Sequence, residues 1–484
     1  MRRIGSGGLV LVWIVVLVFP LGTSAAGPEK AKPQKSPPPK TSQQDEEYYE
    51  LFRTLADVID QVERNYVTPV DRKELLEAAI RGVLQKLDPY SNYIPPEKID
   101  RFRTELENKF GGVGIQVTME NGHLKVISPI VGSPAYRAGV IAGDEIVEIE
   151  GKPVRGMSLD DAIRLMKGPP GTSVTFKVLH PGERKPVSIT VTREIIRLET
   201  VLGARRDEQD RWEYFIDPEH GIAYIRLTAF GPETARDLRQ VLSQLTKDPR
   251  FRALILDLRF NPGGLLSAAV RICDMFLPQG KIVSVKDRHG RERVWRAKGP
   301  GTFEHFPMVV LVNRFSASAS EIVSACLQDH HRALIVGERT WGKGSVQNVI
   351  QLQGGRSALK LTTAAYFRPS GKNIHRHPGA KPSDTWGVMP DKGYRLRMSD
   401  AELRALVRHR RQMDIVRPHH KPSPKKDKPK DQAEQGDNDS DKPPQQPESS
   451  QPKQEKKFVD RHLQKAIEYL IQKIKEQTAT AKKP

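Results

Sequence analysis

The fold class is decided by the stretch that begins at Gly221. Residues 222–227 read IAYIRL, residues 234–245 read TARDLRQVLSQL, and residues 254–258 read LILDL. The first and third are apolar runs of strand length, whereas the second places apolar residues at the spacing of an amphipathic helix. This alternation predicts an α/β domain whose sheet is covered by helices. It continues through helical patterns at 265–276 and 319–327 and strands at 309–312 and 334–336.

Upstream of this domain the pattern changes to short strands. Between residues 110 and 193 they include Glu145–Ile149 and Val174–Leu179. One helix, Leu159–Lys167, interrupts them, and Ser158 is placed to cap it. This segment is therefore predicted to be a compact small β domain.

The first 26 residues predict export. They start with basic residues, continue with a thirteen-residue apolar run at 9–21 and end with small residues at 23–26, which is the pattern of a signal peptide. Because a membrane-spanning helix needs about 20 apolar residues, we expect a cleaved signal peptide, with an uncleaved anchor as the alternative. The expected location is the periplasm or cell envelope, with or without a membrane anchor.

Polar tracts and helical patterns complete the division of the chain. The tracts are too rich in Pro, Lys and Gln to bury a core, and the terminal helix has an apolar face expected to dock on a partner or on this protein. The predicted segments are a signal peptide or anchor at 1–26, a disordered linker at 27–45, an N-terminal helical region at 46–108, the small β domain at 109–195, the α/β core at 196–395, a helix at 396–416 that begins with a capping box of Ser399 and Glu402, a disordered linker at 417–457 and an amphipathic helix at 458–484.

Composition excludes several classes of function. Lys and Arg number 78 against 59 Asp and Glu, a formal charge of +19, but they are dispersed without an aromatic-interleaved basic stripe, so nucleic acid is not expected as a partner. Cys273 and Cys326 each lie in an apolar helical pattern, which favours buried thiols over a disulfide or a metal site. No His-Glu-x-x-His or Cys-x-x-Cys motif is present, so neither a metal nor another cofactor is predicted.

Three segments could carry chemistry, and each has an ordinary structural alternative. Asn313 to Glu321 is a Ser-rich turn that opens a helix, where helix amides could stabilise an oxyanion or a serine could simply cap the helix. Gly337 to Gly344 nearly spells a phosphate-binding loop, but Gly344 replaces the required hydroxyl and a strand follows. Lys343 is then either a solvated lysine or a desolvated base. Asp257 to Leu265 is a Gly-rich turn that could approach a ligand or merely connect strand to helix.

Together these segments resemble the C-terminal processing (tail-specific) peptidases, in register from about Leu51 to Asp391. The resemblance implies an α/β multidomain protein with an N-terminal helical module, a PDZ-type small β domain and a peptidase core of the ClpP/crotonase-like kind. The matching motifs are Tyr66-Val67, Leu87-Asp88-Pro89, Phe110 to Ile115, Ser133-Pro134-Ala135, Ala138-Gly139-Val140, Gly143-Asp144, Asp257 to Leu265, Asn313 to Glu321, Gly337 to Gln347, Tyr366 to Gly371 and Gly387 to Asp391.

The resemblance also implies roles for single residues. Ser318 would be the nucleophile, Lys343 its general base and Gln347 a residue that positions the lysine. The amide of Ala319, with that of Gly263 or Gly264, would form the oxyanion hole. Asp329 would have a supporting role, and Gly112, Val113, Gly114 and Ile115 would form the carboxylate-binding loop of the PDZ domain.

The implied function is that of an exported serine endopeptidase that recognises protein or peptide substrates by apolar C-termini. The alternatives are a catalytically silent PDZ adaptor or chaperone and, more remotely, a nucleotide-dependent enzyme. A homo-oligomer through the N- and C-terminal helices is a further option for partners, beside a membrane tether at the N-terminus.

Two departures from the family pattern stand out. Tyr90 follows Leu-Asp-Pro where the family often has His, and residues 373–386, which contain His375-Arg376-His377-Pro378, are longer than expected. We expect these departures to affect substrate preference and loop geometry without touching the serine and lysine.

Overall fold

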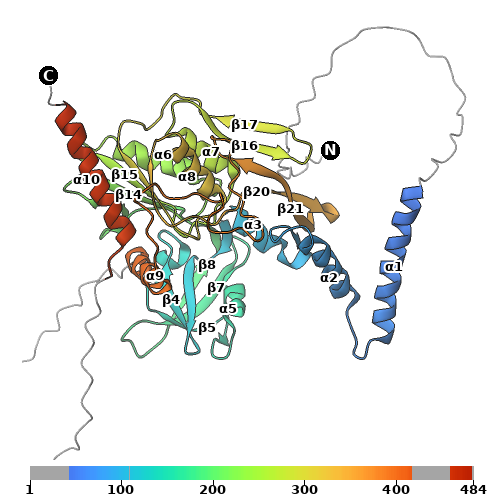
Figure 1. The fold of residues 1–484 in the computed structure, drawn as a ribbon. Helices are drawn as coiled ribbons and strands as arrows, with labels where there is room; N and C mark the ends of the chain where they lie inside the picture. Colours follow the sequence, from blue (N-terminus) through green and yellow to red (C-terminus); the bar gives the residue numbers. More distant parts are fainter. Residues whose placement is uncertain (1–42, 108, 417–457, 482–484) are drawn as a thin grey trace, which may run out of the picture. The chain divides into compact units, whose positions relative to one another are not determined.

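The computed structural model describes residues 43–107, 109–416 and 458–481 (Figure 1). The predicted signal peptide or anchor at 1–26, the linker at 417–457 and residues 27–42 lie outside the described residues. The chain divides into two units between Leu76 and Glu77.

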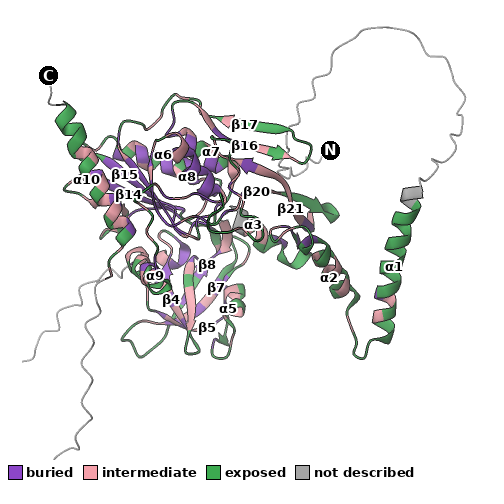
Figure 2. Ribbon diagram, in the orientation of Figure 1, coloured by how far each residue is buried: buried purple, intermediate pink, exposed green. Residues whose placement is uncertain are grey.

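The first unit contains a long helix, α1 (Gln43–Asn65), and the start of α2 (Arg72–Gln85). Arg72 Nε donates to Glu63 Oε2 at 2.7 Å, which ties the start of α2 to the end of α1. Figure 2 shows α1 exposed along nearly all of its length. The exposed side chains include large apolar ones, namely Tyr48, Tyr49, Leu51, Phe52, Leu55 and Val58.

The second unit opens with elements that join a five-stranded antiparallel sheet. Strand β1 (Asn92–Ile94) pairs with β21 (Ser357–Phe367), so the region predicted as helical also supplies a strand. A 3-10 turn at Pro96–Lys98 and α3 (Ile99–Glu107) follow it. Three residues are too few to show the alternating pattern of a strand, so β1 could not be predicted from the sequence. The other strands of this sheet are β16 (Lys281–Asp287), β17 (Glu292–Arg296) and β20 (Ser345–Leu352), and a 3-10 turn at Gln353–Gly355 connects β20 to β21.

The small β domain is closed at its base by β2 (Lys109–Gly112), which pairs with β9 (Glu194–Arg197). Its helix α5 (Leu159–Met166) is capped as predicted, because Ser158 Oγ accepts from the Asp161 N–H at 3.1 Å. The remaining elements are β3 (Ile115–Glu120), β4 (His123–Pro129), α4 (Pro134–Arg137), β5 (Glu145–Ile149), β6 (Lys152–Pro153), β7 (Ser173–Leu179) and β8 (Val187–Thr192).

The α/β core is built on a six-stranded sheet, as the alternation predicted. Strands β14 (Ile222–Leu227), β15 (Ala253–Asp257), β18 (Met308–Val312) and β19 (Leu334–Gly337) are parallel neighbours. Two short strands, β10 (Val201–Leu202) and β13 (Phe215–Asp217), pair antiparallel with β14, and β11 (Arg205–Arg206) and β12 (Trp212–Glu213) form a separate pair.

Both faces of this sheet are covered by helices of the same chain. Successive strand residues point to opposite faces, so Leu254 and Leu256 pack with α6, α7 and α8 while Ile255 packs with α10. In Figure 1, α10 lies beside β15, and it also contacts β18 and β19. The helices are α6 (Thr234–Leu245), α7 (Leu266–Asp274), α8 (Ala319–Asp329), α9 (Asp400–Asp414) and α10 (Arg461–Ala481).

Two further predictions are settled by this packing. The apolar face of the terminal helix docks on its own chain, where Ala466 and Leu470 are fully buried against the sheet. Cys273 and Cys326 are buried free thiols in α7 and α8, as their apolar surroundings predicted. None of the helices in the described ranges is long and apolar enough to cross a membrane.

Candidate active site

The loops after three neighbouring strands converge at one edge of the core sheet. Because β15, β18 and β19 run parallel, the loops that follow them leave from the same edge. These loops carry Gly263, Ser318 and Lys343 respectively. A Cβ added to Gly263 would lie 2.7 Å from Ser318 Cβ, and the N–H groups of Ser318 and Lys343 donate to the same carboxylate oxygen. The structure thus brings the three predicted segments together.

Ser318 stands at the N-terminus of α8 in an unusual backbone conformation. Its φ of 56° and ψ of −114° are rare for a residue other than glycine. Its N–H donates to Glu321 Oε2 at 2.8 Å, and the Tyr366 hydroxyl lies 3.2 Å from its carbonyl oxygen. Backbone strain of this kind persists only where surrounding contacts enforce it, and it concentrates at functional sites.

The surroundings of Lys343 lower the basicity of its side-chain amine. Burial lowers its pKa to about 8, helped by the charge of Lys360 and opposed by those of Glu321 and Asp88. Its Nζ lies 5.1 Å from the centre of the Tyr90 ring and makes no hydrogen bond or ion pair with any residue that the structure describes. An amine with this pKa is about one tenth neutral at pH 7 and about half neutral at pH 8, and its neutral form can act as a general base.

Two backbone amides beside Ser318 are available to bind an oxyanion. The N–H of Gly263 is engaged, because it donates to Asn261 Oδ1 at 2.9 Å. The N–H groups of Gly264 and Ala319 meet no acceptor in the part of the chain that the structure describes. Of the two glycines that the sequence left open, this arrangement favours Gly264 as the partner of Ala319.

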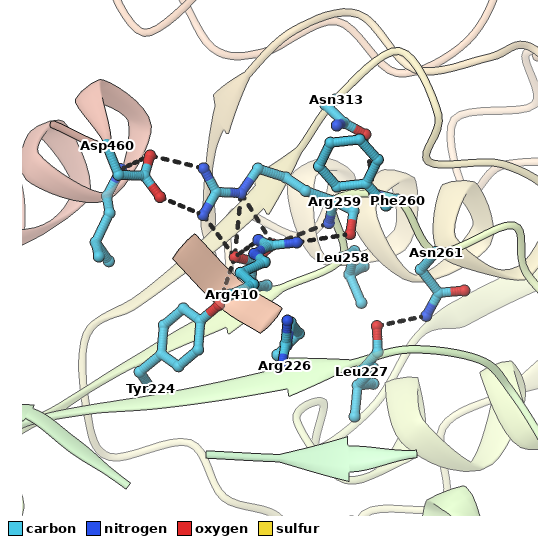
Figure 3. A network of polar contacts seen from close by, with 12 residues as sticks. Tyr224, Arg226, Leu227, Leu258, Arg259, Phe260, Asn261, Asn313, Arg410 and Asp460 are labelled. Atoms are coloured by element: carbon cyan, nitrogen blue, oxygen red, sulfur yellow. Dashed lines mark hydrogen bonds and ion pairs between the residues drawn. The ribbon is translucent and has the colours of Figure 1, made fainter. Parts of the chain in front are cut away.

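The turn that carries these glycines is anchored by a buried network of ion pairs (Figure 3). Arg259, 2% exposed, donates to Asp257 and, at 2.7 and 2.8 Å, to Asp460 just before α10. Arg410 of α9 and the hydroxyl of Tyr224 also bind Asp257. Burial would raise the pKa of Asp257, but Arg259 and Arg410 outweigh it and hold that pKa well below its usual range.

Neither Gln347 nor Asp329 makes a hydrogen bond or ion pair with Ser318 or Lys343 among the described residues. The Gln347 amide donates to Ser345 Oγ at 2.9 Å and to Thr362 Oγ1 at 3.1 Å. Asp329 lies at the other end of α8, about 16 Å along the helix from Ser318 at 1.5 Å per residue. There it pairs with Arg368 at 2.7 Å, which ties α8 to the end of β21.

The expectation that the two departures avoid the serine and lysine is wrong. Tyr90 lies beside the Lys343 amine, and its ring centre is 6.1 Å from that of His375. The loop at 373–386 also binds the lysine loop directly, since Gly344 N–H donates to His375 Nδ1 at 3.3 Å and Arg376 N–H donates to Gly342 O at 2.8 Å. A loop about 30 residues further along the chain thus packs against the loop that carries Lys343, which local patterns cannot reveal.

The loop from Gly112 to Ile115 offers amides to a negatively charged group. The N–H groups of Val113 and Gly114 have no acceptor within the described residues. Gly114 has a φ of 79°, and a Cβ there would lie 2.3 Å from Ser133 Cβ, so only glycine fits. Successive free amides on such a turn can bind a carboxylate.

Comparison with known proteins identifies the family. The profile of peptidase family S41 matches residues 221–391, that of the PDZ domain matches 125–179, and that of the activating protease CtpB N-terminal domain matches 19–98. The carboxy-terminal-processing protease of Bartonella bacilliformis is 38% identical over 389 residues, which cover 77% of this chain and 84% of that protein. This chain belongs to the C-terminal processing proteases of family S41.

Two other proteins are similar over most of their length. The carboxy-terminal processing protease CtpB of Bacillus subtilis is 33% identical and covers 72% of this chain and 70% of its own. The solved photosystem II D1 C-terminal processing protease is 30% identical, covers 71% of this chain and 92% of its own, and has a TM-score of 0.40. The matches to the S41 and PDZ profiles and to the Bartonella and Bacillus proteases show that this chain is a serine-type peptidase with a PDZ domain. Together with the α/β core and the small β domain of the structure, they confirm the predicted fold class.

Sequence reasoning missed two residues of this S41 site. Glu321 was seen only as the end of a Ser-rich motif, although its position three residues after Ser318 is the spacing of a capping box. Tyr366 was seen only as the start of a later motif, and nothing local shows that its hydroxyl reaches Ser318. No group of three or more His, Cys, Asp or Glu side chains in the described ranges is arranged to hold a metal ion.

Proposed function

We propose that this S41 protease is an exported endopeptidase in which Ser318 is the nucleophile and Lys343 the general base. The observation that carries the proposal is the Lys343 amine, desolvated to a pKa of about 8, on a loop held to the Ser318 backbone through one carboxylate. A lysine in this state can accept the serine proton without a histidine.

In the proposed reaction these groups act in sequence. As Ser318 Oγ attacks the scissile carbonyl carbon, its proton passes to Lys343 Nζ, and the negative charge develops on the carbonyl oxygen. The N–H groups of Gly264 and Ala319 would bind that oxygen, an interaction that strengthens in the transition state. The protonated lysine then gives its proton to the leaving amine, and water, deprotonated by the same lysine, hydrolyses the acyl-enzyme.

We propose that the PDZ domain selects substrates by their chain ends. The N–H groups of Val113 and Gly114 would bind the terminal carboxylate, and an extended apolar tail would pair with the neighbouring strand edge. Charge-assisted hydrogen bonds contribute about 1.5–3 kcal/mol each. Loss of the terminal charge should therefore weaken binding at least about tenfold, since about 1.4 kcal/mol corresponds to a factor of ten.

One cleavage assay tests both parts. Ser318→Ala and Lys343→Ala should each lose nearly all activity, and Lys343→Arg should fail too because a guanidinium stays protonated. Lys465→Ala on the surface of α10 is the control. In the wild type, kcat/KM should rise with pH around a midpoint near 8. An unfolded substrate with an amidated apolar tail should be cleaved more slowly than one with a free tail.

Three outcomes would contradict the proposal. Robust cleavage by a folded Ser318→Ala preparation would remove the serine assignment. A pH profile centred below 6 would indicate a carboxylate or histidine base. Equal rates on free and amidated tails would mean that the domain does not read chain ends.

Export and assembly are further parts of the proposal. Export is supported by the signal-peptide pattern of residues 1–26, and fractionation with N-terminal sequencing would test it and distinguish cleavage from anchoring. For a homo-oligomer, the apolar face of α10 is used within its own chain, whereas α1 exposes apolar side chains such as Phe52 and Leu55. Assembly should therefore depend on α1, which light scattering of a chain lacking residues 43–65 would show.

A further inference from the structure

Glu321 is a fully buried carboxylate whose hydrogen-bond donors come from both loops of the site. Its Oε2 accepts the N–H of Ser318 and the N–H of Lys343, each at 2.8 Å. Its Oε1 accepts the N–H of Gly342 at 2.7 Å and the hydroxyl of Thr340 at 2.5 Å. The side chain is 0% exposed. Four donors thus converge on one carboxylate from two segments about twenty residues apart in sequence.

No basic side chain of the described residues forms an ion pair with this carboxylate. Burial raises the pKa of Glu321, and the hydrogen bonds from Thr340 and the backbone only partly offset the effect. An ionised group without an ion pair is expensive to bury. A glutamate required only to start a helix could stay partly exposed, as Glu402 does at the start of α9, where its side chain is 34% exposed and pairs with Arg461. The buried position therefore calls for a role beyond capping.

The opposite side of the same backbone is held by a second buried side chain. The Tyr366 hydroxyl lies 3.2 Å from the carbonyl oxygen of Ser318 and within hydrogen-bond distance of that of Lys343. Tyr366 is 2% exposed. The nucleophile and the base are each held at their N–H by Glu321 and faced at their C=O by Tyr366.

We propose that Glu321 and Tyr366 are positioning residues that fix the two catalytic backbones relative to each other, and that Glu321 also places its negative charge where it acts on the lysine amine. This inference rests on the proposed Ser318 and Lys343 mechanism. It assigns no contact with substrate to either residue. Their effect is on kcat, since displacing catalytic groups by about 1 Å can cost on the order of a hundredfold in rate.

Glu321→Gln separates the electrostatic effect from a merely structural one. The glutamine NH₂ cannot accept, so at least one backbone donor loses its partner, and kcat should fall about 10- to 100-fold with KM nearly unchanged. The negative charge of Glu321 raises the pKa of Lys343. Its removal should lower that pKa, so the rise of kcat/KM with pH should move to lower pH. A loss of packing alone would not shift the profile in this direction.

Glu402→Gln is the matched control, because Glu402 also accepts the N–H of its N-cap residue but lies on the surface of α9. It should leave both kcat and the pH profile unchanged. Tyr366→Phe is the second variant and protects the test if Glu321→Gln does not fold. It should lower kcat without moving the pH profile, since it removes a neutral hydroxyl.

The decisive measurements are kcat, KM and the pH profile of the purified full chain, with thermal melting to confirm folding. A kcat loss in Glu321→Gln without a shift of the profile would show a purely structural role and overturn the proposal, as would wild-type kcat in Tyr366→Phe. If Ser318→Ala is inactive while both variants behave as wild type, only this inference fails. If Ser318→Ala is active, the proposed function fails instead.

Discussion

Two helices of this S41 protease begin with the same Ser-x-x-Glu pattern, but the two patterns have different surroundings and different proposed roles. At α8 the pair is Ser318 and Glu321, and at α9 it is Ser399 and Glu402; in both, the glutamate accepts the N–H of the serine, at 2.8 and 2.7 Å. Ser399 is exposed with an extended backbone, φ −66° and ψ 162°, whereas Ser318 is partly buried with a φ of 56°. The local pattern therefore specifies a helix start, and only the surrounding loops make one of the two starts a site.

The surroundings differ in what is packed against each serine. The loop after β15 brings Gly263 so close to Ser318 that an added Cβ would lie 2.7 Å from Ser318 Cβ, and Glu321 accepts hydrogen bonds from the lysine loop. At α9, Glu402 pairs instead with Arg461 at 2.9 Å near the molecular surface. Ion pairs exposed in this way contribute about 0–1 kcal/mol. Variants that act at the N-terminus of α8 and not at that of α9, or the reverse, test this difference in surroundings.

The largest effect is expected from a substitution that crowds Ser318 at the buried N-terminus of α8. Gly263→Ala would place a Cβ 2.7 Å from both Ala317 O and Ser318 Cβ, at a φ of 101° that an L side chain rarely adopts. Either the serine or the Gly264 turn must move. Because loss of one oxyanion donor alone costs about 10²–10³ in kcat, we expect at least about a hundredfold loss of kcat in the cleavage assay.

The control for Gly263→Ala is Gly290→Ala in the turn between β16 and β17. Gly290 also has a positive φ, 76°, but a Cβ there meets nothing within 4 Å. It should carry the backbone strain without loss of activity. Equal activity in the two variants would mean that contact with Gly263 does not hold Ser318 in place.

The fold of the core could be predicted because its information is local and periodic. The strand Ile222–Leu227 and the helix Thr234–Leu245 were predicted with the bounds that the structure has. Strand β1 was missed because its three residues owe their conformation to pairing with β21. Tertiary pairing of this kind overrides local preference.

The site could be predicted only as far as its motifs reach. The three loops were found because each has an unusual local composition. The proposed roles of Glu321 and Tyr366 and the approach of His375 to the lysine loop depend on contacts between residues 21 to 48 positions apart in sequence. Such contacts leave no periodic trace in a single sequence.

The second effect is on stability and compares two neighbouring residues, one paired at the base of the glycine turn beside Ser318 and the other paired at the N-terminus of α9. Asp460 binds Arg259 at the base of the glycine turn, whereas Arg461 binds Glu402. Asp460→Asn should lower the free energy of unfolding by about 2–3 kcal/mol, because hydrogen bonds to a buried charge are lost. Arg461→Ala should cost about 1 kcal/mol or less. Urea unfolding of both variants measures the difference.

The ion pair of Asp460 should make the stability of the fold depend on pH. Burial would raise its pKa, but Arg259 outweighs this and holds that pKa below its usual value. A carboxyl group whose pKa is lower in the folded state stabilises the fold above its unfolded pKa of about 3.9, and this stabilisation is lost as the pH falls further. Wild type and Asp460→Asn should therefore differ at pH 7 and converge in acid; a constant difference would contradict the ion pair.

The smallest effect is expected from a substitution at the exposed N-terminus of α9. Ser399 Oγ accepts the Glu402 N–H at 3.2 Å, and Ser399→Ala removes this capping bond. Loss of a serine cap costs about 1 kcal/mol, which urea unfolding can measure. Peptide cleavage should remain at the wild-type rate because Ser399 contacts neither the glycine turn nor the lysine loop within the described residues. A tenfold loss of kcat in folded Ser399→Ala would show that α9 transmits its position to the site, through Arg410 and the buried pairs around Asp257. The N-termini of α8 and α9 would then both contribute to the active site.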